Sequence, residues 1–164
     1  VVTPEWHFQH DAGRPLAAML PELKARFPAH AALIDAYAAR FNETIPGPVP
    51  GSLELVERLD AAGVPLFAIT NFGDEFWAGF RPTQPVFDRF RDIIVSGTEK
   101  LAKPDPAIYR LAIERFGIDP AGALFVDDVA ANVAGVELVG IAGHRFVDAA
   151  TLEQDLIKRG YLGA

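Results

Sequence analysis

The sequence has no cysteine among its 164 residues. Disulfide bonds and thiolate metal sites are therefore excluded. No apolar stretch approaches the length of about 20 residues that spans a membrane, and the N-terminus lacks a basic segment followed by an apolar one. We therefore expect a cytoplasmic protein with no membrane partner.

Positive charge is also scarce. Fifteen Lys and Arg residues stand against 22 Asp and Glu residues, which gives a net charge of -7 with neutral histidines. A nucleic-acid backbone or an anionic membrane surface would be repelled by such a chain. A compact anionic substrate stays compatible with this balance, because a few cations gathered at one site can bind it.

Half of the residues are apolar, which suits one globular domain with a small appendage. Residues 15–27 and 29–41 are rich in Ala and Leu at three- and four-residue steps, which predicts two helices, the first of them kinked or restarted at Pro21. The segment TIPGPVPG (44–51) contains three prolines and two glycines and is typical of a stiff linker. We therefore divide the chain into a helical part, 1–45, and a main domain, 46–164.

The main domain alternates between two patterns. Continuous apolar runs, which are typical of parallel strands covered on both faces, occupy residues 64–70, 92–97, 123–128 and, more weakly, 140–146. Helical patterns occupy residues 52–63, 104–117, 130–140 and 149–160. Strands that alternate with helices predict an α/β fold with a doubly wound, Rossmann-like parallel sheet.

Several residues specify details of these helices. In the helix predicted for residues 52–63, Leu53, Val56 and Leu59 are expected to share the buried face. In the helix predicted for residues 104–117, Asp105 is a suitable N-cap and Gly117 is a suitable C-terminal end.

Polar residues follow three of the predicted strands. In chain order they are Thr70 and Asn71, then Ser96, Gly97 and Lys103, then Asp127 and Asp128. Ligands of open parallel sheets bind outside the carboxyl ends of the strands, so these groups could converge. A hydroxyl and an ammonium suit a phosphate, and a carboxylate pair suits a divalent cation.

Each group also has a structural interpretation. Thr70 and Asn71 could form a turn, Lys103 could be a solvated lysine, and Asn132 could lie on a helix surface or orient a carboxylate. Asp127 and Asp128 are harder to explain structurally, because two acids at the end of a buried strand are costly unless they are paired or bind a metal.

Three segments, PGSLELVERLDAAGVPLFAITNFG, KLAKPDPAIYRLAIERFGIDP and ALFVDDVAANV, resemble in order and spacing the haloacid dehalogenase-like (HAD) hydrolase superfamily. The likeness covers about residues 48–146, and the helical first 45 residues loosely resemble part of the family's helical cap. Its phosphatase-like members are the more similar, because true dehalogenases do not use Mg²⁺ and tend to carry Ser where this chain has the Asp pair.

The resemblance implies a role for each residue. Thr70, followed by Asn71, would bind the phosphoryl group of a small phosphorylated metabolite, and Lys103 would neutralise negative charge. Asp127 and Asp128 would hold the cofactor Mg²⁺, with Asp128 as the more direct ligand and Asp127 behind it. Asn132 would support them.

The family's Asp-x-Asp motif, which contains the nucleophile, is absent: no Asp is followed two residues later by another. The resemblance places this motif upstream of Val1, on a central strand between the strands that end at Thr70 and Asp128. We therefore expect a truncated chain that lacks this first strand and performs no covalent phosphoryl transfer alone. Its open sheet edges could pair with a second copy or a partner chain.

Two alternatives to the phosphatase stay open. One is a non-catalytic fragment or interaction module, and the other is a 2-haloacid dehalogenase, which the Asp pair disfavours. The histidines add no catalytic candidate: His7, His10 and His30 are expected to be solvated, and His144 lies on the weakest strand.

Overall fold

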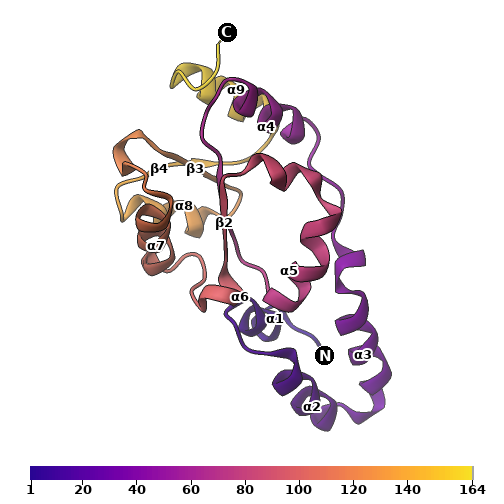
Figure 1. Ribbon diagram of the computed structural model, residues 1–164. Helices are drawn as coiled ribbons and strands as arrows, with labels where there is room; N and C mark the ends of the chain where they lie inside the picture. Colours follow the sequence, from indigo (N-terminus) through magenta and orange to yellow (C-terminus); the bar gives the residue numbers. More distant parts are fainter. Residues whose placement is uncertain (164) are drawn as a thin grey trace. The chain divides into compact units, whose positions relative to one another are not determined.

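The computed structural model describes residues 1–163 (Figure 1). The chain forms two compact units. The first, here called the helical unit, contains residues 1–46, 70–84 and 95–102; the second, the sheet unit, contains residues 47–69, 85–94 and the chain from Lys103 onward. A separate cap domain over residues 1–45 stays a prediction. Across residues 1–163, no helix combines the length and the apolar character needed to cross a membrane.

The helical unit is built from short helices. They are α1 (Pro4–Asp11), α2 (Leu16–Arg26), η1 (Pro28–His30), α3 (Ala31–Arg40), η2 (Phe41–Thr44), α5 (Asp74–Phe80), η3 (Arg81–Thr83) and α6 (Ser96–Glu99). Helices α2 and α3 pack against each other, and Met19, Leu23 and Ile34 are almost completely buried at the core of the unit. Helix α2 continues through Pro21, so the helix does not restart at this residue.

The sheet unit alternates strands and helices, as the apolar runs predict. Its elements are α4 (Ser52–Ala61), β1 (Phe67–Thr70), η4 (Pro85–Arg89), β2 (Asp92–Val95), α7 (Pro106–Phe116), η5 (Pro120–Gly122), β3 (Leu124–Asp127), α8 (Ala130–Glu137), β4 (Ala142–Arg145) and α9 (Ala149–Lys158). The last residues of β1 and β2 are assigned to the helical unit. The chain therefore has an α/β fold.

The strands form two separate pairs. β1 pairs with β2, and β3 pairs in parallel with β4, with Leu124 opposite Ala142 and Asp127 opposite Arg145. Within residues 1–163 no ladder of hydrogen bonds joins the two pairs. A missing first strand between β1 and β3, inferred from the family resemblance, stays a prediction. All four residues of β1 are half-buried, and Val126 of β3 is 37% exposed.

The buried face predicted for helix α4 is wrong. Leu55, which sequence analysis left out, is 3% exposed, whereas Leu53 is 37% exposed. Leu55 and Leu59 are four residues apart and share one face, which packs against Leu152 and Leu156 of α9. The helix is therefore rotated relative to the expected face.

The predicted ends of α7 are confirmed. The Asp105 carboxylate accepts a hydrogen bond from the Ala107 N–H at 2.8 Å, so Asp105 is the N-cap. Gly117 ends the helix with φ of 63°, a left-handed conformation that favours glycine. This helix follows directly after the loop that carries Lys103.

Candidate functional site

Asp127, the last residue of β3, has both carboxylate oxygens engaged. Oδ2 accepts a hydrogen bond from Lys103 Nζ at 2.7 Å. Oδ1 accepts one from the Val129 N–H at 2.9 Å and one from Asn132 Nδ2 at 3.0 Å. The Asp127 side chain is only 7% exposed, so three donors fix a nearly buried carboxylate.

Lys103 reaches this carboxylate from the loop before α7. Its side chain is 12% exposed, and its Nζ lies 5.6 Å from the centre of the Phe125 ring, within the range of a cation–π contact. The structure thus brings Lys103, Asp127 and Asn132 together, three residues that sequence analysis selected. Their catalytic roles stay predictions.

Asp128 differs from its neighbour. It is exposed, and among residues 1–163 its carboxylate has no hydrogen-bond or ion-pair partner. Only its backbone carbonyl is contacted, by Arg145 Nε at 3.4 Å. The pair therefore consists of one carboxylate held by the protein and one open to water or to a cation, which is a donor set that fits Mg²⁺.

Tyr109, on α7, supports the site and was missed by sequence analysis. It is fully buried, its ring packs edge-on against Phe125 with centroids 5.4 Å apart, and its hydroxyl donates to the Asn132 carbonyl at 2.8 Å. Burial, together with the nearby charge of Asp127, raises the pKa of Tyr109 above its ordinary value, so the hydroxyl stays a donor. In the sequence, Tyr109 looks like one more core residue of an amphipathic helix.

Gly135, on α8, was also missed. A Cβ at this position would lie 2.5 Å from the Pro104 carbonyl oxygen and 3.0 Å from Tyr109 Cε2. Helix α8, which carries Asn132, thus approaches the backbone next to Lys103 too closely for any side chain. Gly135 therefore permits the close packing of α8 against Pro104 and Tyr109.

Thr70 and Asn71 belong to the helical unit, where both are half-buried at the end of β1. Their convergence with Lys103 and the Asp pair stays a prediction. Ser96, from the same unit, has a structural role instead: it is fully buried, its hydroxyl donates to the Asp11 carbonyl at 2.5 Å, and it accepts from the Phe72 N–H at 2.9 Å.

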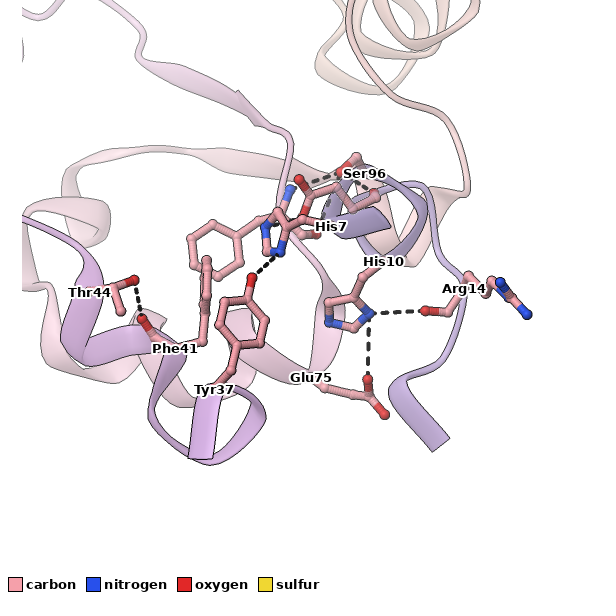
Figure 2. A network of polar contacts seen from close by, with 10 residues as sticks. His7, His10, Arg14, Tyr37, Phe41, Thr44, Glu75 and Ser96 are labelled. Carbon is pink, nitrogen blue, oxygen red and sulfur yellow. Dashed lines mark hydrogen bonds and ion pairs between the residues drawn. The ribbon is translucent and has the colours of Figure 1, made fainter. Parts of the chain in front are cut away.

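The prediction that the histidines of the helical unit are solvated is wrong for His10 and His7. His10 is fully buried, and its Nδ1 lies 3.0 Å from the Arg14 carbonyl oxygen and 3.6 Å from Glu75 Oε2 (Figure 2). His7 is half-buried, with its side chain 22% exposed and stacked on Phe41 at 4.8 Å. Sequence periodicity did not reveal this, because α1 has no clear apolar face.

His7 links Tyr37 to Asp11. The Tyr37 hydroxyl is 2.6 Å from His7 Nδ1 (Figure 2). On the other side of the ring, His7 Nε2 is 3.4 Å from Asp11 Oδ1. Burial lowers the pKa of His7, although Asp11 opposes this effect, so at neutral pH the ring is uncharged and accepts the Tyr37 proton in a hydrogen bond. Burial and the charge of Asp11 raise the pKa of Tyr37 to about 12.

We expect the Asp11→Asn variant to gain stability relative to the wild type as pH rises from 4 to 7. Burial raises the pKa of Asp11 above its ordinary value, against the attraction of His7 and His10. The folded state therefore holds this proton more tightly than the unfolded state, and the contribution of Asp11 to wild-type stability falls as pH rises from about 4 through the raised pKa. Asn does not titrate. Urea unfolding of both proteins at pH 4, 5, 6 and 7 measures the difference, and a constant or falling difference would contradict the prediction.

The sequence profile of haloacid dehalogenase-like hydrolases matches residues 4–140 of this chain. The chain belongs to this family. A probable phosphoglycolate phosphatase of Pseudomonas putida is 32% identical over 116 residues, which are 68% of this chain and 45% of that protein. An (S)-2-haloacid dehalogenase of Burkholderia cepacia is 32% identical over 92 residues, 56% of this chain and 39% of that protein. The chain thus spans less than half the length of these HAD relatives.

Solved HAD structures share the fold. An enzyme of Bacteroides thetaiotaomicron, crystallised with magnesium and inorganic phosphate, has a TM-score of 0.72 and 22% identity, and the match covers 89% of this chain and 79% of that one. A predicted HAD-like hydrolase of Porphyromonas gingivalis also has a TM-score of 0.72, at 17% identity, covering 96% of this chain and 81% of that one.

Proposed function

We propose that this chain supplies the phosphate- and metal-binding part of a Mg²⁺-dependent phosphatase that acts on a small phosphorylated metabolite. The observation that carries the proposal is the asymmetric Asp pair, in which Asp127 is held by Lys103 and Asn132 while the Asp128 carboxylate is open. The phosphoglycolate phosphatases among the relatives, and the magnesium and phosphate bound by the Bacteroides enzyme, support the same chemistry.

Asp128 would be the direct ligand of Mg²⁺, and Asp127 would stand behind it. Mg²⁺ is typically held by one or two carboxylates, with water and substrate phosphate oxygens completing the coordination. When bound, it neutralises charge on the phosphate and polarises the phosphoryl group. Asp127 cannot rotate freely toward a cation, because its two oxygens already accept three hydrogen bonds.

The other residues would hold the phosphate. Lys103 presents a positive charge at a fixed place beside Asp127, and Thr70 and Asn71, assigned by the family resemblance, would donate hydrogen bonds to phosphoryl oxygens. The nucleophile of an aspartyl-phosphate mechanism would be an Asp outside this chain, since no Asp-x-Asp motif occurs in it. We therefore propose that residues 1–164 alone bind phosphate and Mg²⁺ without turnover.

The proposal is tested by Mg²⁺ binding in the presence of inorganic phosphate, measured by calorimetry. Asp128→Asn should weaken Mg²⁺ binding by about tenfold or more, because it removes the open carboxylate. Glu114→Gln is the matched control, since Glu114 is also an exposed carboxylate of the sheet unit, on α7, and is not one of the residues assigned to the site. Equal weakening in both variants, or none in Asp128→Asn, would refute the metal site.

Hydrolysis of a generic phosphate ester separates binding from turnover. We expect no Mg²⁺-dependent hydrolysis by residues 1–164, and hydrolysis by a protein extended upstream by a strand that carries Asp-x-Asp. Turnover by residues 1–164 alone would show that the nucleophile lies within this chain.

A second candidate is a non-catalytic module that pairs with another chain. It is favoured by the break between the two strand pairs, since half-buried β1 and partly exposed β3 each present an edge. For this candidate we expect a stable oligomer in sedimentation experiments, with no Mg²⁺ or phosphate binding.

A further inference from the structure

We propose that the sheet unit carries a second anion-binding site, in a groove between the free edge of β4 and helix α9. The groove is shallow and open to solvent and has a volume of about 420 Å³. The argument uses six of its lining residues: Gly143, Arg145, Thr151, Asp155, Lys158 and Arg159. Arg145 also contacts the Asp128 backbone carbonyl, at 3.4 Å, and the other five residues are not among those assigned to the proposed phosphate and metal site.

The groove carries uncompensated positive charge. Three cationic side chains line it, against the single carboxylate of Asp155. That carboxylate is already occupied, because its Oδ2 is 2.9 Å from both His144 Nδ1 and Arg159 Nε. Within residues 1–163, Lys158 has no ion-pair or hydrogen-bond partner, and Arg145 makes only the 3.4 Å contact with the Asp128 carbonyl. On a chain with a net charge of -7, this local excess of cations stands out.

The free edge of β4 adds neutral donors. The Phe146 N–H donates to the Asp127 carbonyl of β3 at 2.9 Å. Because the N–H groups of successive strand residues point to opposite sides, those of Gly143 and Arg145 point away from β3, toward the free edge. Two backbone amides therefore face the groove beside the cationic side chains.

Helix α9 places its groove residues on one face. Thr151, Asp155 and Lys158 are four and three residues apart, a spacing that aligns side chains along a helix. Residues 151 to 158 span about 10 Å along the axis, Lys158 and Arg159 lie at the C-terminal end of this span, and Arg145 lines the groove from β4, so the cations come from two elements. We infer that the ligand is a small oxyanion with more than one charged group, and that it binds without a metal.

The test is a titration with pyrophosphate in metal-free buffer, followed by backbone amide NMR. We expect saturable shifts at Gly143 and Arg145 and smaller ones at Lys103. Lys158→Ala and Arg145→Ala should each weaken pyrophosphate binding by about fivefold or more, because each removes a charged contact. Added salt should also weaken pyrophosphate binding, because it screens these charges. A parallel citrate titration shows whether the groove prefers phosphate or carboxylate groups.

Arg110→Ala is the matched control, because Arg110 is an exposed cation of the same unit on α7, outside the groove, and its replacement removes the same charge. Binding should be unchanged in this variant. Non-saturating shifts, or equal weakening in the groove and control variants, would refute the anion-binding site. Lys158 and Arg145 would then be charges that only protect the edge of β4 from pairing with another strand. The absence of metal separates this result from the test of Asp128.

Discussion

Lys103→Met should lower the free energy of unfolding by about 3 kcal/mol at neutral pH, because it leaves the Asp127 carboxylate buried without its cation. The Asp127 side chain is only 7% exposed, so water replaces little of the lost interaction. The Val129 N–H and Asn132 Nδ2 still donate to it, which places the effect at the lower end of the range for broken buried pairs. Met keeps most of the apolar stem beside Phe125.

Lys24→Met is the matched control for this change. Lys24 and Asp35 also pair at 2.7 Å, but their side chains are 33% and 58% exposed. An exposed pair contributes at most about 1 kcal/mol, so this variant should change stability little. Urea unfolding, followed by fluorescence and by circular dichroism, measures both variants, and similar losses would contradict a special role for the buried pair.

The double variant Lys103→Met with Asp127→Asn isolates the charge. A neutral amide in place of the carboxylate no longer requires a cation, so we expect the double variant to recover at least half of the lost stability. Stability as low as that of Lys103→Met would show instead that the lysine acts through packing of its stem.

Gly135→Ala should lower the free energy of unfolding by about 2 kcal/mol, because the added methyl group overpacks the contact between α8 and the loop of Lys103. The new Cβ would lie 2.5 Å from the Pro104 carbonyl oxygen, a backbone atom that cannot move without moving Lys103. Alanine is a better helix former by about 1 kcal/mol, which offsets only part of this cost. The variant should also weaken the Lys103–Asp127 pair.

Gly122→Ala controls for the removal of a glycine, because a Cβ at this position meets nothing within 4 Å. It should leave the midpoint of urea unfolding almost unchanged. Combining Gly135→Ala with Lys103→Met should cost less than the sum of the two changes, since both disturb the same pair. Strict additivity would argue against this coupling between α8 and the lysine loop.

The proposed site was accessible to sequence reasoning because its residues follow strand ends. An apolar run that ends in Asp127 and Asp128 marks the carboxyl end of a strand, and Lys103 stands just before a helix with clear capping residues. These signals are local, and the structure brings Lys103, Asp127 and Asn132 together. The structure holds the Asp127 carboxylate and leaves that of Asp128 open, and the roles of both residues as metal ligands stay predictions.

Other features were not accessible, because they depend on which faces meet. Tyr109 and Leu55 are two apolar positions among many, and only packing shows that one supports Asn132 and the other, rather than Leu53, enters the core. The burial of His10 and Ser96 and the close approach at Gly135 have the same origin.

The sequence by itself determined the order of strands and helices, the ends of α7 and the residues at the strand ends, because hydrophobic period, capping and strand-end chemistry are properties of short segments. Tertiary structure alone decided which donors hold Asp127, which aspartate stays open, and where cations gather beside β4. These outcomes depend on contacts between segments far apart in the chain, such as the 2.7 Å pair of Lys103 and Asp127, and no local pattern encodes a contact of that kind.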